Sequence, residues 1–135
     1  MSPVYRVGTS GFSYDEWKGS FYPEDLSKKD MLAYYAERLG TVEINNTFYR
    51  MPKASMLEGW AADVPDDFTF VLKVSRRITH QKKLADAGGD VEYLWSQAHV
   101  LSDRLGPFLV QLPPYLKRDD ALLRDHLATW PAEAR

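Results

Sequence analysis

The chain has 135 residues, enough for one domain with a core, and 44% of them are hydrophobic, which is typical of a globular protein rather than a disordered one. It has no cysteine, which excludes disulfides and thiolate metal sites, and its net charge of −2 gives no overall attraction to nucleic acid or acidic membranes. No run approaches the roughly 18 apolar residues of a membrane span, and MSPVYRVGTSG does not resemble a signal peptide. We therefore expect a cytoplasmic protein with no membrane partner.

The first half of the chain predicts two strand–helix units. Strands are expected at residues 4–8 and 42–47, and helices at residues 28–39 and 55–63. Ser27 with Asp30 three residues later resembles a capping box at the start of the first helix, and Gly40 follows its end.

The second half predicts two more units, with strands at residues 68–75 and 108–112 and helices at residues 90–105 and 119–130. The order βα, repeated four times, favours a parallel sheet covered by helices. Two strand-to-helix connections, residues 9–27 and 76–89, are long, whereas the helix-to-strand connections are short. Long loops in compact domains are usually functional, and ligands of parallel α/β folds bind at the carboxyl ends of the strands.

The stretch TVEINNTFYR carries polar residues in the middle of a predicted strand. Because side chains alternate between faces, Glu43 and Asn45 lie opposite Val42 and Ile44. In the third and fourth strands the same face would carry Lys73 and Gln111. Helices on both faces would bury these groups at a cost of several kcal/mol for an unpaired ion. Inside a barrel they would line the upper interior, so we predict a TIM-barrel-like α/β fold.

Four segments resemble the signature blocks of the YecE-like family, domain of unknown function 72. They are GTSGFSYDEWKGSFYP, TVEINNTFYRMP, KVSRRITH and GPFLVQLPP, in this order over nearly the whole chain. One departure is Phe12, where the family often has tryptophan. The resemblance implies a TIM-barrel-like fold of about twice this length, and it implies no particular reaction.

From this resemblance we expect residues 1–135 to form a single domain, the N-terminal half of a TIM-barrel-like domain truncated before a fifth strand. Four βα units would make a half-barrel of parallel strands with outer helices. Two interpretations follow: the chain is a fragment of a longer gene product, or it pairs with a second copy in a homodimer that completes the barrel.

Glu43 and Lys73 are the candidate catalytic residues, on neighbouring strands and pointing inward. The carboxylate would act as a general base or bind substrate, beside an ammonium that stabilises negative charge. The alternative is an interior ion pair that neutralises itself. The carboxamides of Asn45 and Gln111, with the Thr47 hydroxyl, would line the same site and position a substrate.

Two loops supply further candidates for binding. Arg76, Thr79 and His80 in SRRITH suit an anionic group, or else belong to a solvated basic loop. No carboxylate–histidine spacing near His80 forms a metal motif, so no metal site is predicted and the residues identify no cofactor.

The first loop begins with GTSG, whose amides would face an anion near Ser10, although it lacks a P-loop or dinucleotide fingerprint; a tight turn is the alternative. Tyr14 and Trp17 would stack a sugar or a base, or would pack their own loop.

These residues favour a hydrolase or lyase acting on a small phosphate-bearing or sugar-like substrate. Glu43 would be the base, Lys73 and Arg76 would hold developing negative charge, and Asn45 and Gln111 would orient the substrate. The alternatives are a non-catalytic binder of a small anion or of nucleic acid, and metal-dependent phosphodiester cleavage by fold-level analogy with barrel endonucleases.

Overall fold

The computed structural model describes residues 2–135 and contains one sheet of four parallel strands in the order β1-β2-β3-β4. The strands are β1 (Gly8–Ser10), β2 (Thr41–Ile44), β3 (Thr69–Lys73) and β4 (Leu105–Leu109). The helices are α1 (Met31–Ala36), α2 (Asn46–Tyr49), α3 (Ala54–Ala62), α4 (Gly88–Ala98) and α5 (Asp120–Leu127), with 3-10 or π segments at Asp15–Trp17, Lys28–Asp30, Arg77–Gln81 and His99–Arg104. The predicted α/β order is confirmed.

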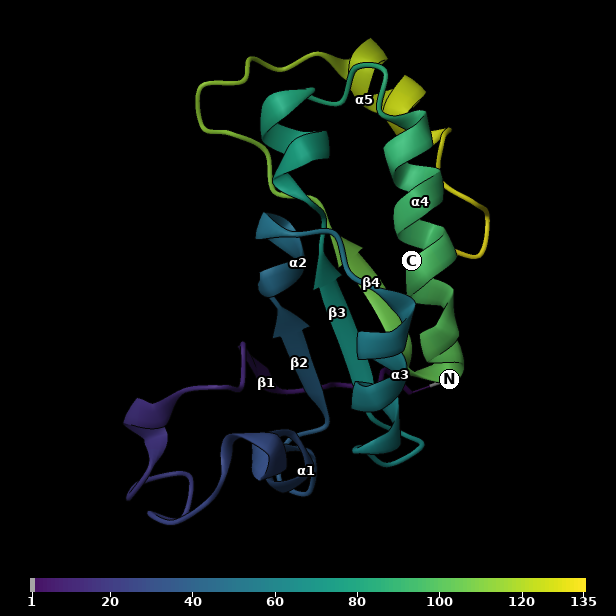
Figure 1. Ribbon diagram of the computed structural model, residues 1–135. Coiled ribbons are helices and arrows are strands. Elements are labelled where there is room, and N and C mark those ends of the chain that lie inside the picture. The colour runs from purple at the N-terminus through teal and green to yellow at the C-terminus, as the bar shows by residue number, and fades with distance from the viewer. Residues whose placement is uncertain (1) are drawn as a thin grey trace.

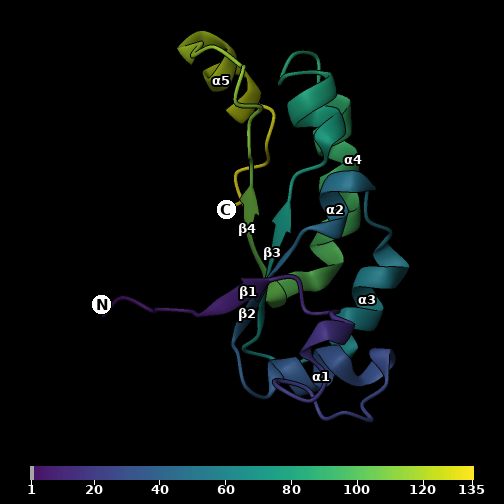
Figure 2. The ribbon, with the colours of Figure 1, turned by 90° about the vertical axis from the view of Figure 1, so that its left-hand side faces the viewer.

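Helices cover only one face of this sheet. Figure 1 shows the strands running side by side with α2 above the tip of β2, and Figure 2 shows α1, α2, α3 and α4 all on the same side. The other face is open, and β1 and β4 form the two edges because the sheet does not close. The structure is therefore the expected half-barrel of parallel strands with outer helices.

The covered face holds the core because alternate strand residues point into it. Val42, Ile44, Phe70 and Leu72 are all at most 3% exposed. They pack with residues of α1 and α3, whereas Val74 and a second cluster pack with α4. Burying each such side chain stabilises the fold by about 1.5–3 kcal/mol, so this face fixes where the helices lie.

The fourth strand was predicted three residues too late. It begins at Leu105 and includes Gly106 and Pro107, which were expected to lie in the preceding turn. Phe70 pairs with Leu105 and Leu72 pairs with Phe108, so three residues of β4 span the distance of two in β3. This irregularity is a bulge, and bulges on edge strands accommodate proline.

The first strand was also misplaced, because residues 4–7 look like a strand but lie outside the sheet, and β1 begins only at Gly8. Val4, Tyr5 and Val7 are 79%, 86% and 73% exposed. The ladder starts only where Gly8 pairs with Thr41, so the preceding residues have no neighbouring strand.

Three of the predicted helices are shorter in the structure, whereas α3 has the predicted length and begins one residue earlier. At the first helix, the Ser27 hydroxyl donates to the Asp30 carboxylate and no side chain caps a backbone N–H, so the predicted capping box does not form. At α5, the Asp119 carboxylate accepts from the Leu122 N–H at 3.0 Å, a regular N-cap.

His126, on α5, makes a buried hydrogen bond that holds this helix in place. Its ring is 2% exposed, and its Nε2 accepts a hydrogen bond from the Trp130 indole N–H at 3.0 Å. Trp130 packs in turn on Phe108 of β4, with ring centroids 4.8 Å apart. Burial lowers the pKa of His126, because the charged imidazolium would lose its hydration.

Gly8→Ala should lower the free energy of unfolding by about 1–3 kcal/mol, the range for overpacked sites. A Cβ at this position would lie 1.9 Å from the Thr41 carbonyl oxygen, which belongs to the neighbouring strand. Gly59→Ala in α3 is the matched control, since a Cβ there meets nothing within 4 Å and the change should stabilise by about 0.5–1 kcal/mol. Urea unfolding measures both; equal effects of the two changes would contradict the close approach of β1 to β2.

His126 should make stability fall in mild acid. A histidine whose folded pKa lies below its unfolded value of about 6.5 costs nothing above that pH, and destabilises progressively as the pH falls below it. His126→Gln should therefore reduce the loss of melting temperature between pH 7.5 and 5.5. His99→Gln, at an exposed position, is the control and should leave the pH dependence unchanged.

Candidate functional site

The open face of the sheet carries Ser10, Glu43 and Lys73 near the carboxyl ends of β1, β2 and β3. Glu43 lies between buried Val42 and Ile44, and Lys73 follows buried Leu72, so both side chains point to the open face. The Ser10 hydroxyl donates to Glu43 Oε1 at 3.4 Å. Glu43 pairs with Val71, which puts Lys73 roughly 7 Å further along the strands, enough space for a small ligand.

A cavity of about 420 Å³ runs along this face below Lys73. Ser10 and Glu43 line this cavity together with Val71 and Leu109. At the amino ends of the strands Arg6 closes it, and its guanidinium donates to the Asp67 carbonyl at 2.7 Å. Arg6 was not among the predicted site residues, because the sequence placed it inside the strand expected at residues 4–8 and gave no sign of a site there.

The Lys73 ammonium rests on an aromatic ring. Its Nζ lies 4.6 Å from the ring centroid of Phe48, and the imidazole of His80 meets the same ring edge-on at 5.0 Å. No ion pair joins Lys73 to Glu43 within residues 2–135, so the alternative of a self-neutralising pair is not what the structure contains. A cation–π contact holds the ammonium in place without cancelling its charge.

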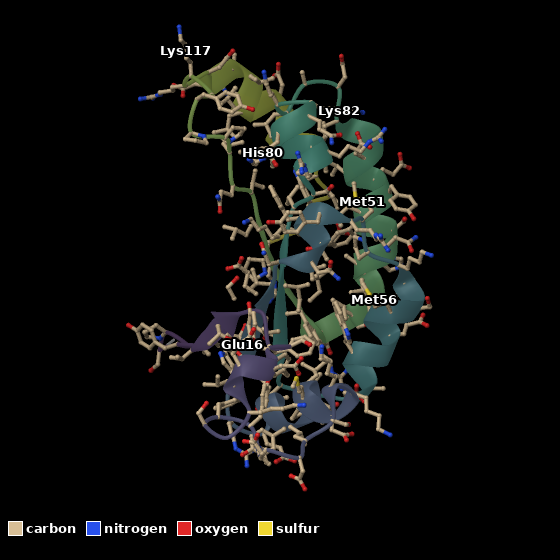
Figure 3. The ribbon with its side chains drawn as sticks, turned by 60° about the vertical axis from the view of Figure 1, so that its left-hand side comes forward. Glu16, Met51, Met56, His80, Lys82 and Lys117 are labelled. Carbon is tan, nitrogen blue, oxygen red and sulfur yellow. The ribbon has the colours of Figure 1, made fainter. Side chains whose placement is uncertain are left out.

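The basic loop after β3 is held by Asp90. Arg77 Nε donates to Asp90 Oδ1 at 2.7 Å, and Lys82 Nζ lies 2.5 Å from Oδ2. Burial raises the pKa of Asp90, but the hydrogen bonds from Lys82 and Arg77 outweigh it and hold the pKa below its usual range. Figure 3 shows His80 and Lys82 together at the end of the molecule where the strands terminate.

The three predicted residues of this loop have different environments. Arg76 is exposed and takes part in no ion pair within the described chain, so its guanidinium is available. His80 is half-buried, and its Nδ1 lies 2.8 Å from the Thr79 hydroxyl. Thr79 is completely buried, so it orients His80 and does not reach a ligand itself.

Two predicted site residues, Asn45 and Thr47, are not brought to the open face. The strand expected at residues 42–47 ends at Ile44, and Asn45 already has helical backbone angles. Thr47 is 1% exposed, with its hydroxyl 2.7 Å from the Lys73 carbonyl and 3.0 Å from the Ile44 carbonyl, so it ties the ends of β2 and β3 together. Gln111 is exposed, two residues beyond Leu109 at the end of β4, and its role in the site stays a prediction.

Asn45 instead lines a second cleft of about 260 Å³ at the ends of β1 and β2. The first loop contributes Tyr14, whose hydroxyl donates to the Ser10 carbonyl at 2.6 Å. Tyr49 of α2 and Trp60 of α3 complete the wall. The paired asparagines, which favour turns over strands, were the signal in the sequence that the strand ends there.

Trp17 packs its own loop. Its ring contacts Tyr14, Phe21 and Tyr22 at centroid distances of 4.7–5.7 Å, and this aromatic cluster joins the core beside α1. The Tyr22 hydroxyl donates to the Phe12 carbonyl, and burial, with a smaller effect of Tyr35, raises the pKa of Tyr22 to about 12.

No group of three or more His, Cys, Asp or Glu side chains in residues 2–135 is arranged to hold a metal ion. Over the same residues, no helix combines the length and the apolar character needed to cross a membrane.

The fold and its polar end define a parallel (βα) half-barrel protein of the TIM-barrel type. The chain belongs to the family described as "Protein of unknown function DUF72", whose model matches residues 6–135. The resemblance found in the sequence motifs is thereby confirmed.

Two curated relatives carry names of the same group. The UPF0759 protein YecE of Escherichia coli K12 is 33% identical over 82 residues, which cover 61% of this chain and 30% of YecE. The UPF0759 protein YunF of Bacillus subtilis is 25% identical over 111 residues, 82% of this chain and 34% of YunF.

A crystal structure of a DUF72 family protein from Thermotoga maritima superposes with a TM-score of 0.79 at 32% identity, covering 96% of this chain and 53% of that one. One from Enterococcus faecalis gives a TM-score of 0.73 at 25% identity, covering 91% and 44%. The chain therefore spans about a third of the curated relatives and about half of the solved ones.

Asp90→Asn should loosen the loop after β3, because Arg77 and Lys82 would lose their common partner. Exposed or half-exposed ion pairs contribute about 0.5–1 kcal/mol, so amide hydrogen exchange in residues 77–87 should rise about two- to fivefold. Asp103→Asn, at an exposed position with no ion pair in the described chain, is the control. Since the pKa of Asp90 is lowered, the wild-type loop should also loosen as the pH falls below about 4; an unchanged loop in either test would contradict the assignment.

Proposed function

We propose that the open face binds a small anionic, phosphate-bearing or sugar-like substrate, and that Glu43 acts there as a general base in a hydrolase or lyase reaction. The observation that carries the proposal is that Glu43 and Lys73 share this face without neutralising each other. Opposite charges kept apart near a cavity are what proton transfer beside a developing anion requires.

Each residue has a role that follows from its position. The Glu43 carboxylate accepts a proton, from an attacking water in hydrolysis or from the carbon beside the leaving group in elimination. The Ser10 hydroxyl, 3.4 Å from Oε1, orients that carboxylate. The Lys73 ammonium binds the anionic group of the substrate and stabilises negative charge as it develops.

The loop after β3 extends the anion site. Arg76 is exposed and follows β3 by three residues, so its planar guanidinium can reach a phosphate or carboxylate held by Lys73. His80 shares the Phe48 ring with Lys73 and lies at the rim of the same region. The anion is therefore expected between Lys73 and Arg76, and the proton acceptor deeper on the face.

Binding of inorganic phosphate and of a panel of sugar phosphates, measured by thermal shift and calorimetry, tests this assignment. Lys73→Ala should weaken binding of the anion about tenfold or more, because the ammonium contacts it directly. Glu43→Gln should leave anion affinity unchanged or slightly higher, since it removes a negative charge while keeping the shape of the side chain. For any sugar phosphate that is turned over, Glu43→Gln should slow the reaction about 10²- to 10⁴-fold.

Lys117→Ala and Glu92→Gln are matched controls, because both side chains are exposed and neither lines the open-face cavity. Equal binding by wild type and Lys73→Ala, or equal turnover by wild type and Glu43→Gln, would reject the proposal.

A further inference from the structure

The second cleft has the features of a ligand site separate from the open face. It lies where β1 and β2 end, between the first loop, α2 and α3, and it shares no lining residue with the open-face cavity. The backbones of Ser10–Gly11 and Glu43–Ile44 stand between the two. Its volume of about 260 Å³ lies just below the usual range of pockets that bind drug-sized ligands. A cleft of this volume is the size expected for a single ring.

Two carboxamides in this cleft have no partner in the protein. Asn45 is half-buried and Asn46 is exposed, and neither side chain makes a hydrogen bond to any of residues 2–135. Neighbouring polar groups are used: the Thr47 hydroxyl bonds to backbone carbonyls, and the Tyr14 hydroxyl donates to Ser10. Each carboxamide offers two donors and an acceptor, so the cleft presents a pair of groups able to bind hydroxyls.

The base of the cleft is apolar and rigid. Ile44 is 3% exposed, and Trp60 stacks on Phe70 at 6.2 Å while meeting Phe12 edge-on at 6.1 Å. At the rim, Tyr49 is 65% exposed, and its ring is set against Phe48 in an edge-on contact at 5.0 Å. An exposed aromatic ring held in one orientation is suited to stacking on a flat apolar surface.

No side chain lining the cleft is charged, which favours a neutral ligand over an ion. A nucleobase is apolar on both faces and is best held between two rings, but one face of Trp60 is already covered by Phe70. A sugar ring has an apolar face of C–H groups and a rim of hydroxyls. The apolar face of the sugar matches the aromatic side chains at the bottom of the cleft, and its rim matches the carboxamides at the edge. Its remaining hydroxyls would stay in water.

We propose that this cleft binds a neutral sugar ring. The ring would stack against Tyr49 and the aromatic side chains at the bottom of the cleft, and Asn45 and Asn46 would form hydrogen bonds to its hydroxyls. The proposal does not rest on the function assigned to the open face, because none of the residues is shared. It gives the protein a second binding site at the carboxyl ends of the strands.

Titration of the isotope-labelled chain with neutral methyl glycosides of glucose, galactose, mannose and N-acetylglucosamine tests the site by NMR. At least one should shift the side-chain amide signals of Asn45 and Asn46 and the indole N–H of Trp60. Asn45→Ala and Tyr49→Ala should each weaken that binding about tenfold or more. Tyr115→Ala is the matched control, since Tyr115 is also 65% exposed and does not line the cleft, and it should bind like wild type.

The other results would overturn the proposal. Shifts caused by adenosine or uridine and not by the glycosides would assign the cleft to a base, and no shift with any probe at high millimolar concentration would remove the site. Unchanged binding in Tyr49→Ala with an unaltered melting temperature would place the sugar elsewhere. Glu43→Gln should bind the glycosides like wild type, so failure of the open-face function leaves this test intact.

Discussion

The structure depends on one constraint: a strand that is covered by helices on one side must keep its ionic groups on the other. In β2 the buried side chains Val42 and Ile44 flank Glu43, so the covering helices cannot exchange faces without burying a carboxylate. An unpaired ion beneath a helix would cost several kcal/mol, comparable with the net stability of a small domain. The same residue pattern therefore fixes the side on which the helices pack and the side on which chemistry can occur.

The ends of the strands, and not their middles, separate the two clefts. The chain turns at Asn45, directly after Ile44, and the Thr47 hydroxyl then bonds to the carbonyl of Lys73 on the adjacent strand. This contact holds α2 against the tip of β3 and brings Phe48 beneath the Lys73 ammonium. One short helix thus supplies the platform for the cation of the open face and, through Tyr49, the rim of the second cleft.

Much of the half-barrel fold and of its open face was predictable from the sequence. The alternation of Val42, Glu43 and Ile44 is local and strong, and the motifs are specific. The open-face positions of Glu43 and Lys73 follow from it. Asn45 and Thr47 were assigned to the same face by extending the alternation, which fails once the strand stops.

The fourth strand was placed three residues too late for a different reason. Periodicity encodes neither the turn at Asn45 nor the bulge in β4. The bulge lies opposite Phe70 and Leu72 and shifts β4, and its position depends on pairing with β3, more than thirty residues earlier in the chain. Trp17 shows a further limit of prediction from sequence. An aromatic residue in a loop gives the same sequence pattern whether it stacks on a ligand or packs into the core, as Trp17 does.

The distribution of cations after β3 explains how a chain of net charge −2 presents a positive end. Asp90 pairs with both Arg77 and Lys82, and in doing so anchors the loop. Lys73 and Arg76 have no carboxylate within ion-pair distance in the described chain, and Lys73 is held by an aromatic ring instead. An ion pair would have fixed Lys73 equally well but would have cancelled its field. The cation–π contact with Phe48 preserves that field at the carboxyl ends, where an incoming anion meets it before it meets Glu43.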